Sequence, residues 1–86
     1  MSSLRLGVST KPEVTHISAF GFWILYQQEE LFLGFDDFPW FKDQTVRVIA
    51  NIRLEGEGHF YWPDLDVDLS VQIIREPEKY PIRFGR

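Results

Sequence analysis

Three aspartates at alternate positions are the residues whose spacing points most directly to chemistry. Asp64, Asp66 and Asp68 follow an aromatic–proline corner, and apolar residues stand between them. Such alternation predicts a strand with carboxylates on one face and apolar side chains on the other. Neighbouring carboxylates repel one another unless solvent, a cation or a basic partner relieves the charge. The segment is therefore a candidate metal site, a candidate protein contact, or the solvated face of a strand.

A metal-dependent function would combine these aspartates with one of the two histidines, His16 or His59. Carboxylate oxygens suit hard cations such as calcium. However, the spacing does not match the twelve-residue loop of a helix–loop–helix calcium site, and nothing in their spacing couples the histidines. Alternate acids on a strand are more often simply exposed. We predict no metal site and keep metal binding as the alternative function.

No arrangement typical of catalysis accompanies these residues. The serines and threonines do not stand on the glycine-flanked turn that exposes a hydrolytic nucleophile. The segment Gly56-Glu57-Gly58 lacks the lysine of a phosphate-binding loop, and its glutamate would repel phosphate. We predict that the protein is not an enzyme and uses no cofactor.

The composition is that of a small globular domain. The chain has 86 residues, 44% hydrophobic and 26% charged, which favours one folded domain over disorder. It has no cysteine, which predicts a reducing, cytoplasmic compartment. No apolar run reaches the roughly 20 residues that span a bilayer, so we expect no membrane association. The net charge of −4 disfavours direct nucleic-acid binding.

Aromatic residues, at 16% of the chain, are the stronger functional signal. Three neighbouring pairs stand out: Phe22-Trp23, Trp40-Phe41 and Tyr61-Trp62. Neighbours on a strand point to opposite faces, so these rings cannot all reach one core. Either one ring of each pair is core and the other is covered by a helix or the tail, or the outer rings form a protein interface, where Trp and Tyr are enriched.

The first half of the chain predicts a three-strand antiparallel meander followed by a helix. Runs of β-favouring residues at 14–18, 22–26 and 30–35 lie too close together for parallel crossovers. Apolar residues between Phe41 and Ile52 recur with helical spacing. Asp43 is a candidate N-cap of that helix.

The second half predicts a further β-unit and a short closing helix. Strands are expected at 52–55, 59–62 and 66–69. Ser70 is a candidate N-cap for a helix over 71–75. Together these elements predict the α+β class, with one antiparallel sheet of about five to six short strands and helical cover on one face.

The predicted domain boundaries follow from the same pattern. Residues 1–13 contain scattered Ser, Thr, Gly and Pro and are expected to form a flexible N-terminal lead-in. Residues 14–81 are expected to form a single α+β domain. Residues 82–86 are expected to form a C-terminal tail.

Two segments carry a resemblance to a known family. The sequences FDDFPWF at 35–41 and YWPDLDVDL at 61–69 resemble a small bacterial family called domain of unknown function 2442. The order of elements is similar from Val14 to about Pro81. The resemblance implies a small α+β fold and no established activity. Members often occur in mobile or paired-gene contexts, which implies an antitoxin-like role beside a small protein partner.

We therefore predict a cytoplasmic protein-interaction domain that acts through aromatic and acidic surface. The expected contact residues are Trp40, Tyr61, Trp62, Asp64 and Asp66. The partner is another protein or a second copy of the chain, as in a homodimer. An acidic surface suits neutralisation of a cationic toxin better than binding to DNA. The alternative is a metal-binding module or metal-dependent enzyme that uses Asp64, Asp66, Asp68 and a histidine.

Overall fold

The computed structural model describes residues 11–80. The strands in that range are β2 (Glu13–Ile17), β3 (Gly21–Tyr26), β4 (Glu29–Gly34), β5 (Arg53–Leu54), β6 (His59–Trp62) and β7 (Val67–Ser70). The α-helices are α1 (Val46–Ala50) and α2 (Val71–Arg75), and the short 3₁₀ helices are η1 (Pro39–Phe41) and η2 (Pro77–Lys79). The expected tail over 82–86 and all but the last residues of the expected lead-in over 1–13 lie outside the described residues.

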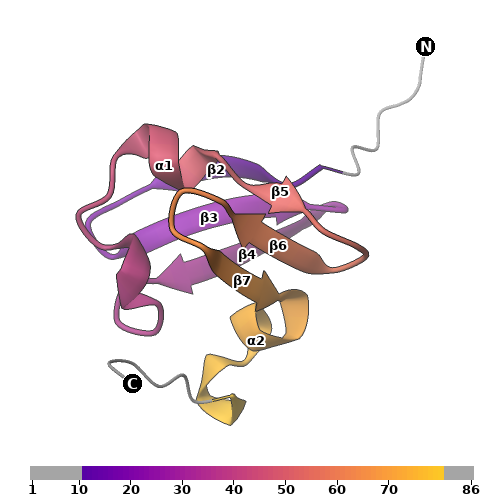
Figure 1. Cartoon of the computed structure of the whole chain (residues 1–86). Helices are drawn as coiled ribbons and strands as arrows, with labels where there is room; N and C mark the ends of the chain where they lie inside the picture. The colour runs from indigo at the N-terminus through magenta and orange to yellow at the C-terminus, as the bar shows by residue number, and fades with distance from the viewer. Residues whose placement is uncertain (1–10, 81–86) are drawn as a thin grey trace.

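The described strands form two antiparallel three-stranded sheets, in the orders β2-β3-β4 and β5-β6-β7. Figure 1 shows the second sheet lying across the first, with α1 at one side of the pair and α2 at the other. The α+β class is confirmed. The expected single sheet of five to six strands with helical cover on one face is not confirmed. The second β-unit pairs within itself, and its apolar side packs on the first sheet where a helix was expected.

The β3–β4 hairpin shows how the sequence forms the first sheet. Phe22, Ile24 and Tyr26 are buried on one face of β3, and the residues between them face outward. The register pairs Tyr26 with Glu29 and leaves the two-residue turn Gln27-Gln28. Both turn residues have positive φ angles, 50° and 67°. This is the backbone of a type I′ turn, whose twist matches that of the flanking strands.

The core lies between the sheets and is rich in aromatic side chains. The ring centroids of Phe22 and Trp62 lie 6.3 Å apart, and those of Tyr26 and Phe60 lie 5.0 Å apart, so both pairs join the two sheets. The ring centroids of Phe41, in η1, and Trp62 lie 4.7 Å apart. Edge-to-face pairs of this kind add about 0.5–1.5 kcal/mol beyond the burial of area. The largest fully buried side chains are Trp62, Phe22, Phe38, Phe41, Phe60, Ile24, Leu33 and Ile49.

Helix α1 is shorter than the predicted helical pattern. Thr45 is its N-cap, and the Thr45 hydroxyl accepts a hydrogen bond from the Val48 N–H at 3.2 Å. The prediction of Asp43 as N-cap is wrong, because Asp43 lies before the helix with a φ of 65°. The apolar residues at the ends of the pattern belong to other segments, Phe41 to η1 and Ile52 to the approach to β5.

The three aspartates do not share one strand face, so that prediction is wrong, whereas the strand expected at 66–69 is present one residue later as β7. Residues 63–66 form a turn before β7 begins. Asp66 has a φ of 54°, a left-handed conformation that aspartate tolerates but a strand does not use. Of the three aspartates, only Asp68 lies on a strand. The prediction of Ser70 as N-cap of α2 is confirmed, since its hydroxyl accepts a hydrogen bond from the Ile73 N–H at 3.3 Å.

The buried indole of Trp62 gives a first test of this core. Trp62→Phe removes the N–H that donates to the Ile49 carbonyl and leaves a small cavity, so we expect a loss of about 2 kcal/mol or more in the free energy of unfolding. Urea unfolding measures the change. Trp23→Phe, on the exposed side of β3, is the matched control and should cost less than about 1 kcal/mol. Equal losses in the two variants would contradict this account of the core.

Two paired glycines give a second test. A Cβ at Gly21 would lie 2.3 Å from the Leu33 carbonyl oxygen, so the backbone of the hairpin would have to move. A Cβ at Gly34 would lie 3.3 Å from the Phe32 ring, which can shift. We expect Gly21→Ala to lower the free energy of unfolding by about 2 kcal/mol or more and Gly34→Ala to lower it by less than about 1 kcal/mol, measured by urea unfolding. The reverse order would show that the β3–β4 register is wrong.

Candidate interaction surface

In each neighbouring aromatic pair, one ring belongs to the core. Phe22, Phe41 and Trp62 have no exposed surface. The Trp62 indole N–H donates to the Ile49 carbonyl at 2.9 Å, so the polar atom of this ring is also satisfied inside the protein. Trp62 was predicted as a contact residue, but the structure assigns it to the core, where it cannot touch a partner directly.

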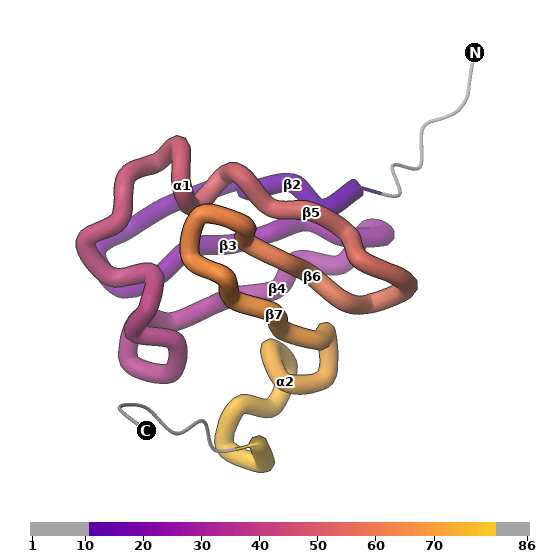
Figure 2. The backbone as a smooth tube through the Cα atoms, in the orientation of Figure 1, coloured from indigo at the N-terminus to yellow at the C-terminus, as the bar shows by residue number. Residues whose placement is uncertain are grey.

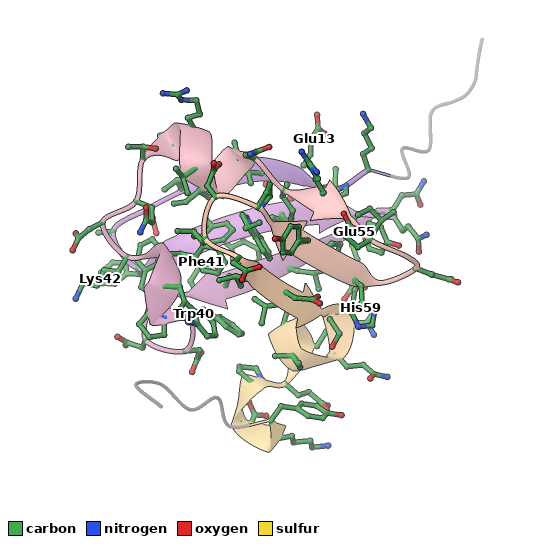
Figure 3. All side chains as sticks on the ribbon, in the orientation of Figure 1. Glu13, Trp40, Phe41, Lys42, Glu55 and His59 are labelled. Carbon is green, nitrogen blue, oxygen red and sulfur yellow. The ribbon has the colours of Figure 1, made fainter. Side chains whose placement is uncertain are left out.

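Residues 38–41, with Pro39 at the start of η1, form a turn that we call the proline corner, and Trp40 is half-buried there. Its ring stacks on Phe38, with centroids 6.2 Å apart and an interplanar angle of 27°. It also meets the edge of Phe41 at 6.3 Å. Figure 3 shows Trp40 and Phe41 together at this corner, with Lys42 pointing away from the body of the protein. The corner itself therefore covers much of the Trp40 ring, which leaves only part of it for a contact.

Tyr61, Asp64 and Asp66 make hydrogen bonds around the turn between β6 and β7. The Tyr61 hydroxyl donates to Asp66 Oδ1 at 2.9 Å, and this hydrogen bond raises the pKa of Tyr61 above its usual value of 10.0. Asp64 Oδ2 accepts a hydrogen bond from the Asn51 side-chain amide at 2.9 Å. The structure thus brings Tyr61 and Asp66 together, and their polar atoms stabilise the turn.

The described residues contain no group of three or more His, Cys, Asp or Glu side chains that could hold a metal ion. Asp64 and Asp66 lie in the turn, whereas Asp68 lies on β7. His16 belongs to the first sheet and His59 to the second. The aspartates and a histidine therefore do not converge, and the geometry of the described residues gives no support to the alternative metal-dependent function.

The outward side of the first sheet carries an exposed aromatic pair that was not among the predicted contact residues. Trp23 of β3 and Phe32 of β4 are directly opposite each other, with ring centroids 5.0 Å apart. Trp23 is 36% and Phe32 39% exposed, and Phe20 in the β2–β3 turn is 80% exposed. We call Trp23 and Phe32 the outer aromatic face. The sequence did carry a signal for this face: side chains alternate along a strand, so burial of Phe22 and Ile24 directs Trp23 outward.

The same face carries the paired glycines at one end of the strands. Gly21 and Gly34 are opposite each other in the register. The Phe32 ring lies over Gly21, since a Cβ there would be 2.7 Å from the ring. The Phe32 ring is therefore held between Trp23 on one side and the bare backbone of Gly21 on the other. Its position is fixed before any partner arrives, which lowers the entropic cost of a contact.

A cleft of about 370 Å³ lies at the opposite end of the hairpin, between the β3–β4 turn, the β5–β6 loop and α2. Figure 2 shows the two turns at the same end of the molecule. The buried Tyr26 hydroxyl accepts a hydrogen bond from the Gly58 N–H at 3.2 Å. Arg75 closes one side of the cleft with a bidentate ion pair to Glu29, Nε to Oε2 at 2.9 Å. Two of the charged side chains that line the cleft, Glu29 and Arg75, are thus paired with each other, and Glu57 lines it as well.

The Glu29–Arg75 pair shifts the titration of both groups. Hydrogen bonds from Arg75 lower the pKa of Glu29 below its usual value of 4.5, and the same contact raises the pKa of Arg75. Both side chains are about half exposed, so solvent screens the attraction. The pair links α2 to β4, but it contributes little to the free energy of unfolding.

Fold and surface together define a small two-layered α+β protein with an aromatic patch on one outer face. The chain belongs to the family described as Protein of unknown function (DUF2442), whose sequence profile matches residues 12–80. The suspected family is thereby confirmed. Comparison with curated proteins and with solved structures gives no significant match. Within residues 11–80, no helix is long and apolar enough to cross a membrane.

The Glu29–Arg75 pair predicts part of the acid sensitivity of the fold. Because the folded pKa of Glu29 is lowered, its stabilising effect is present above the unfolded value of 4.5 and is lost as the pH falls through the folded pKa. Glu29→Gln should therefore show a smaller drop in unfolding free energy between pH 7 and pH 3 than the parent. Glu30→Gln, at the next position and on the other face of β4, is the control. An unchanged acid response in Glu29→Gln would contradict the pairing.

Proposed function

We propose that the chain is a non-enzymatic protein-interaction domain whose contact surface is the outer aromatic face. The observation that carries the proposal is the exposed pair Trp23–Phe32, positioned by the β3–β4 register on the side of the sheet away from the core. Trp and other aromatic residues are enriched in the centres of protein interfaces because they bury much area with few rotatable bonds.

The amount of exposed ring surface supports this assignment. An aromatic side chain offers about 150–250 Å² in all, so the exposed fractions of Trp23 and Phe32 leave roughly 150 Å² of apolar surface on this face. The face with Tyr61 and Asp66 is the weaker candidate, because its polar groups are already hydrogen-bonded to each other.

An antitoxin-like role beside a small partner is the most concrete version of this proposal. An antitoxin of this kind acts by covering another protein and needs no catalytic group of its own. The chain contains no cysteine, which supports a cytoplasmic setting for the contact. Its net charge of −4 favours a protein partner over the phosphate backbone of a nucleic acid.

Affinity capture from the native cell tests the proposal. The tagged full chain should retain a defined partner in stoichiometric amount, and the Trp23→Ser/Phe32→Ser double variant should lose most of it, because the centre of the contact is removed. Asp68→Asn, on the outer face of the second sheet, is the control and should retain the partner. Circular dichroism checks that all three proteins are folded. Retention by the double variant, or no partner with any protein, would overturn the proposal.

A further inference from the structure

We infer that the outer aromatic face binds a basic, amphipathic segment of a partner protein, in which Arg or Lys side chains alternate with apolar ones. This inference rests on the proposed function and specifies the chemistry of the partner. It is carried by the arrangement of carboxylates around the aromatic pair, which the register of the first sheet fixes.

Carboxylates stand on both ends of the aromatic pair. At one end, Glu13 of β2 and Glu30 of β4 both pair with Leu25, so the three side chains form one row across the outward side of the sheet. At the other end, the Asp37 carboxylate lies beside Gly34, since a Cβ there would be 3.7 Å from Asp37 Oδ2. We call Glu13, Glu30 and Asp37 the acidic rim.

The row between these ends is aromatic. After the bulge in β2, the register places His16 opposite Trp23, and Trp23 opposite Phe32. An apolar centre inside a charged rim is the usual anatomy of a protein contact. The distance along a strand between the Leu25 row and the Trp23 row is about 7 Å, two residues of an extended chain. A partner in extended conformation has the same repeat, so its alternate side chains can match these rows.

The three carboxylates of the acidic rim take no part in holding the described fold together. Within residues 11–80, Glu13, Glu30 and Asp37 make no ion pair or side-chain hydrogen bond. By contrast, Asp64 and Asp66 accept hydrogen bonds from side chains that fix the β6–β7 turn. Rim carboxylates that do nothing for the fold are available to steer and orient a cationic partner.

The aromatic centre also favours cations. A guanidinium or ammonium group over the face of Trp is attracted by the ring quadrupole, and the long stems of Arg and Lys pack on apolar surface. An Arg lying over Trp23 can reach a rim carboxylate with its planar head. The centre and the rim therefore select for the same side chains.

A second copy of this chain is a poor occupant of the face. In a two-fold contact, the outer faces of the two copies can pack in two ways. Either the Leu25 rows of both copies lie together, or the Leu25 row of one copy lies against the Asp37 end of the other. The first arrangement sets Glu13 and Glu30 against their own copies, and the second sets them against Asp37. Either way, like charges meet at the rim of the contact, which costs free energy.

Peptide binding to the full chain tests the inference. The probes are three 12-residue peptides with the same alternate Leu and Phe positions and with Arg, Ser or Glu at the remaining positions. We expect the Arg peptide to bind at least about tenfold more tightly than the Ser peptide, with an advantage that shrinks between 50 and 300 mM salt. Surface plasmon resonance measures the dissociation constants.

Three variants test separately what the acidic rim and the aromatic pair contribute to peptide binding. Neutralising the acidic rim, Glu13→Gln/Glu30→Gln/Asp37→Asn, should abolish the preference for Arg and its salt dependence. Trp23→Ser should weaken all binding, and the Asp68→Asn control should behave as the parent. Equal binding of the three peptides, or an unchanged preference in the rim variant, would overturn the inference.

The cellular partner distinguishes this inference from the proposed function. If affinity capture depends on Trp23 and Phe32 but not on the acidic rim or on salt, the interaction role stands and the basic partner is wrong. If sedimentation shows a parent dimer that Trp23→Ser dissociates, the occupant is a second copy and the inference is overturned. If the captured protein is lost in both the centre and the rim variants, the inference is supported.

Discussion

The burial of Trp62 is the interaction on which the rest of the structure depends. Its ring lies on β6 and contacts the ring of Phe22 from the first sheet and that of Phe41 from the proline corner. Its indole N–H donates to the carbonyl of Ile49 in α1. One side chain thus joins both sheets, the corner and the first helix. Two sheets of three short strands are each marginal alone, so such contacts between them fix their relative orientation, with Tyr26 against Phe60 at the other end of the core.

A core of this kind also determines which surface is left outside. With only two layers, the outward residues of β3 and β4 have no third layer of described elements to cover them, and Trp23 and Phe32 stay accessible. The two outer faces differ in kind. On the second sheet, the Tyr61 hydroxyl donates a hydrogen bond to Asp66 and Asp68 is exposed, so that face is polar. On the first sheet, apolar rings lie between carboxylates that have no internal partner, and such a surface gains more from a protein contact.

The elements that the sequence predicted correctly depend on local patterns. Alternation in β3 and the hydroxyl of Ser70 act within a few residues, so periodicity and capping rules identify them. The errors arose where a backbone conformation or a long-range contact decides. Asp66 interrupts an alternation that looked continuous because it adopts a left-handed φ. Periodicity sets the buried face of each strand but not its partner, so it could not separate one sheet from two. Burial of Trp62 depends on Ile49, thirteen residues away.

The alternation of β3 allows fold and contact to be changed separately. Phe22 and Trp23 are neighbours in sequence, yet one ring lies wholly in the core and the other lies on the outer face. A polar residue at position 22 would be buried without a partner and would unfold the domain. The same residue at position 23 would remain in solvent and would change only what the sheet can bind. Selection on a partner can therefore act on Trp23, Phe32 and the acidic rim while the inward residues of the same strands keep the fold unchanged.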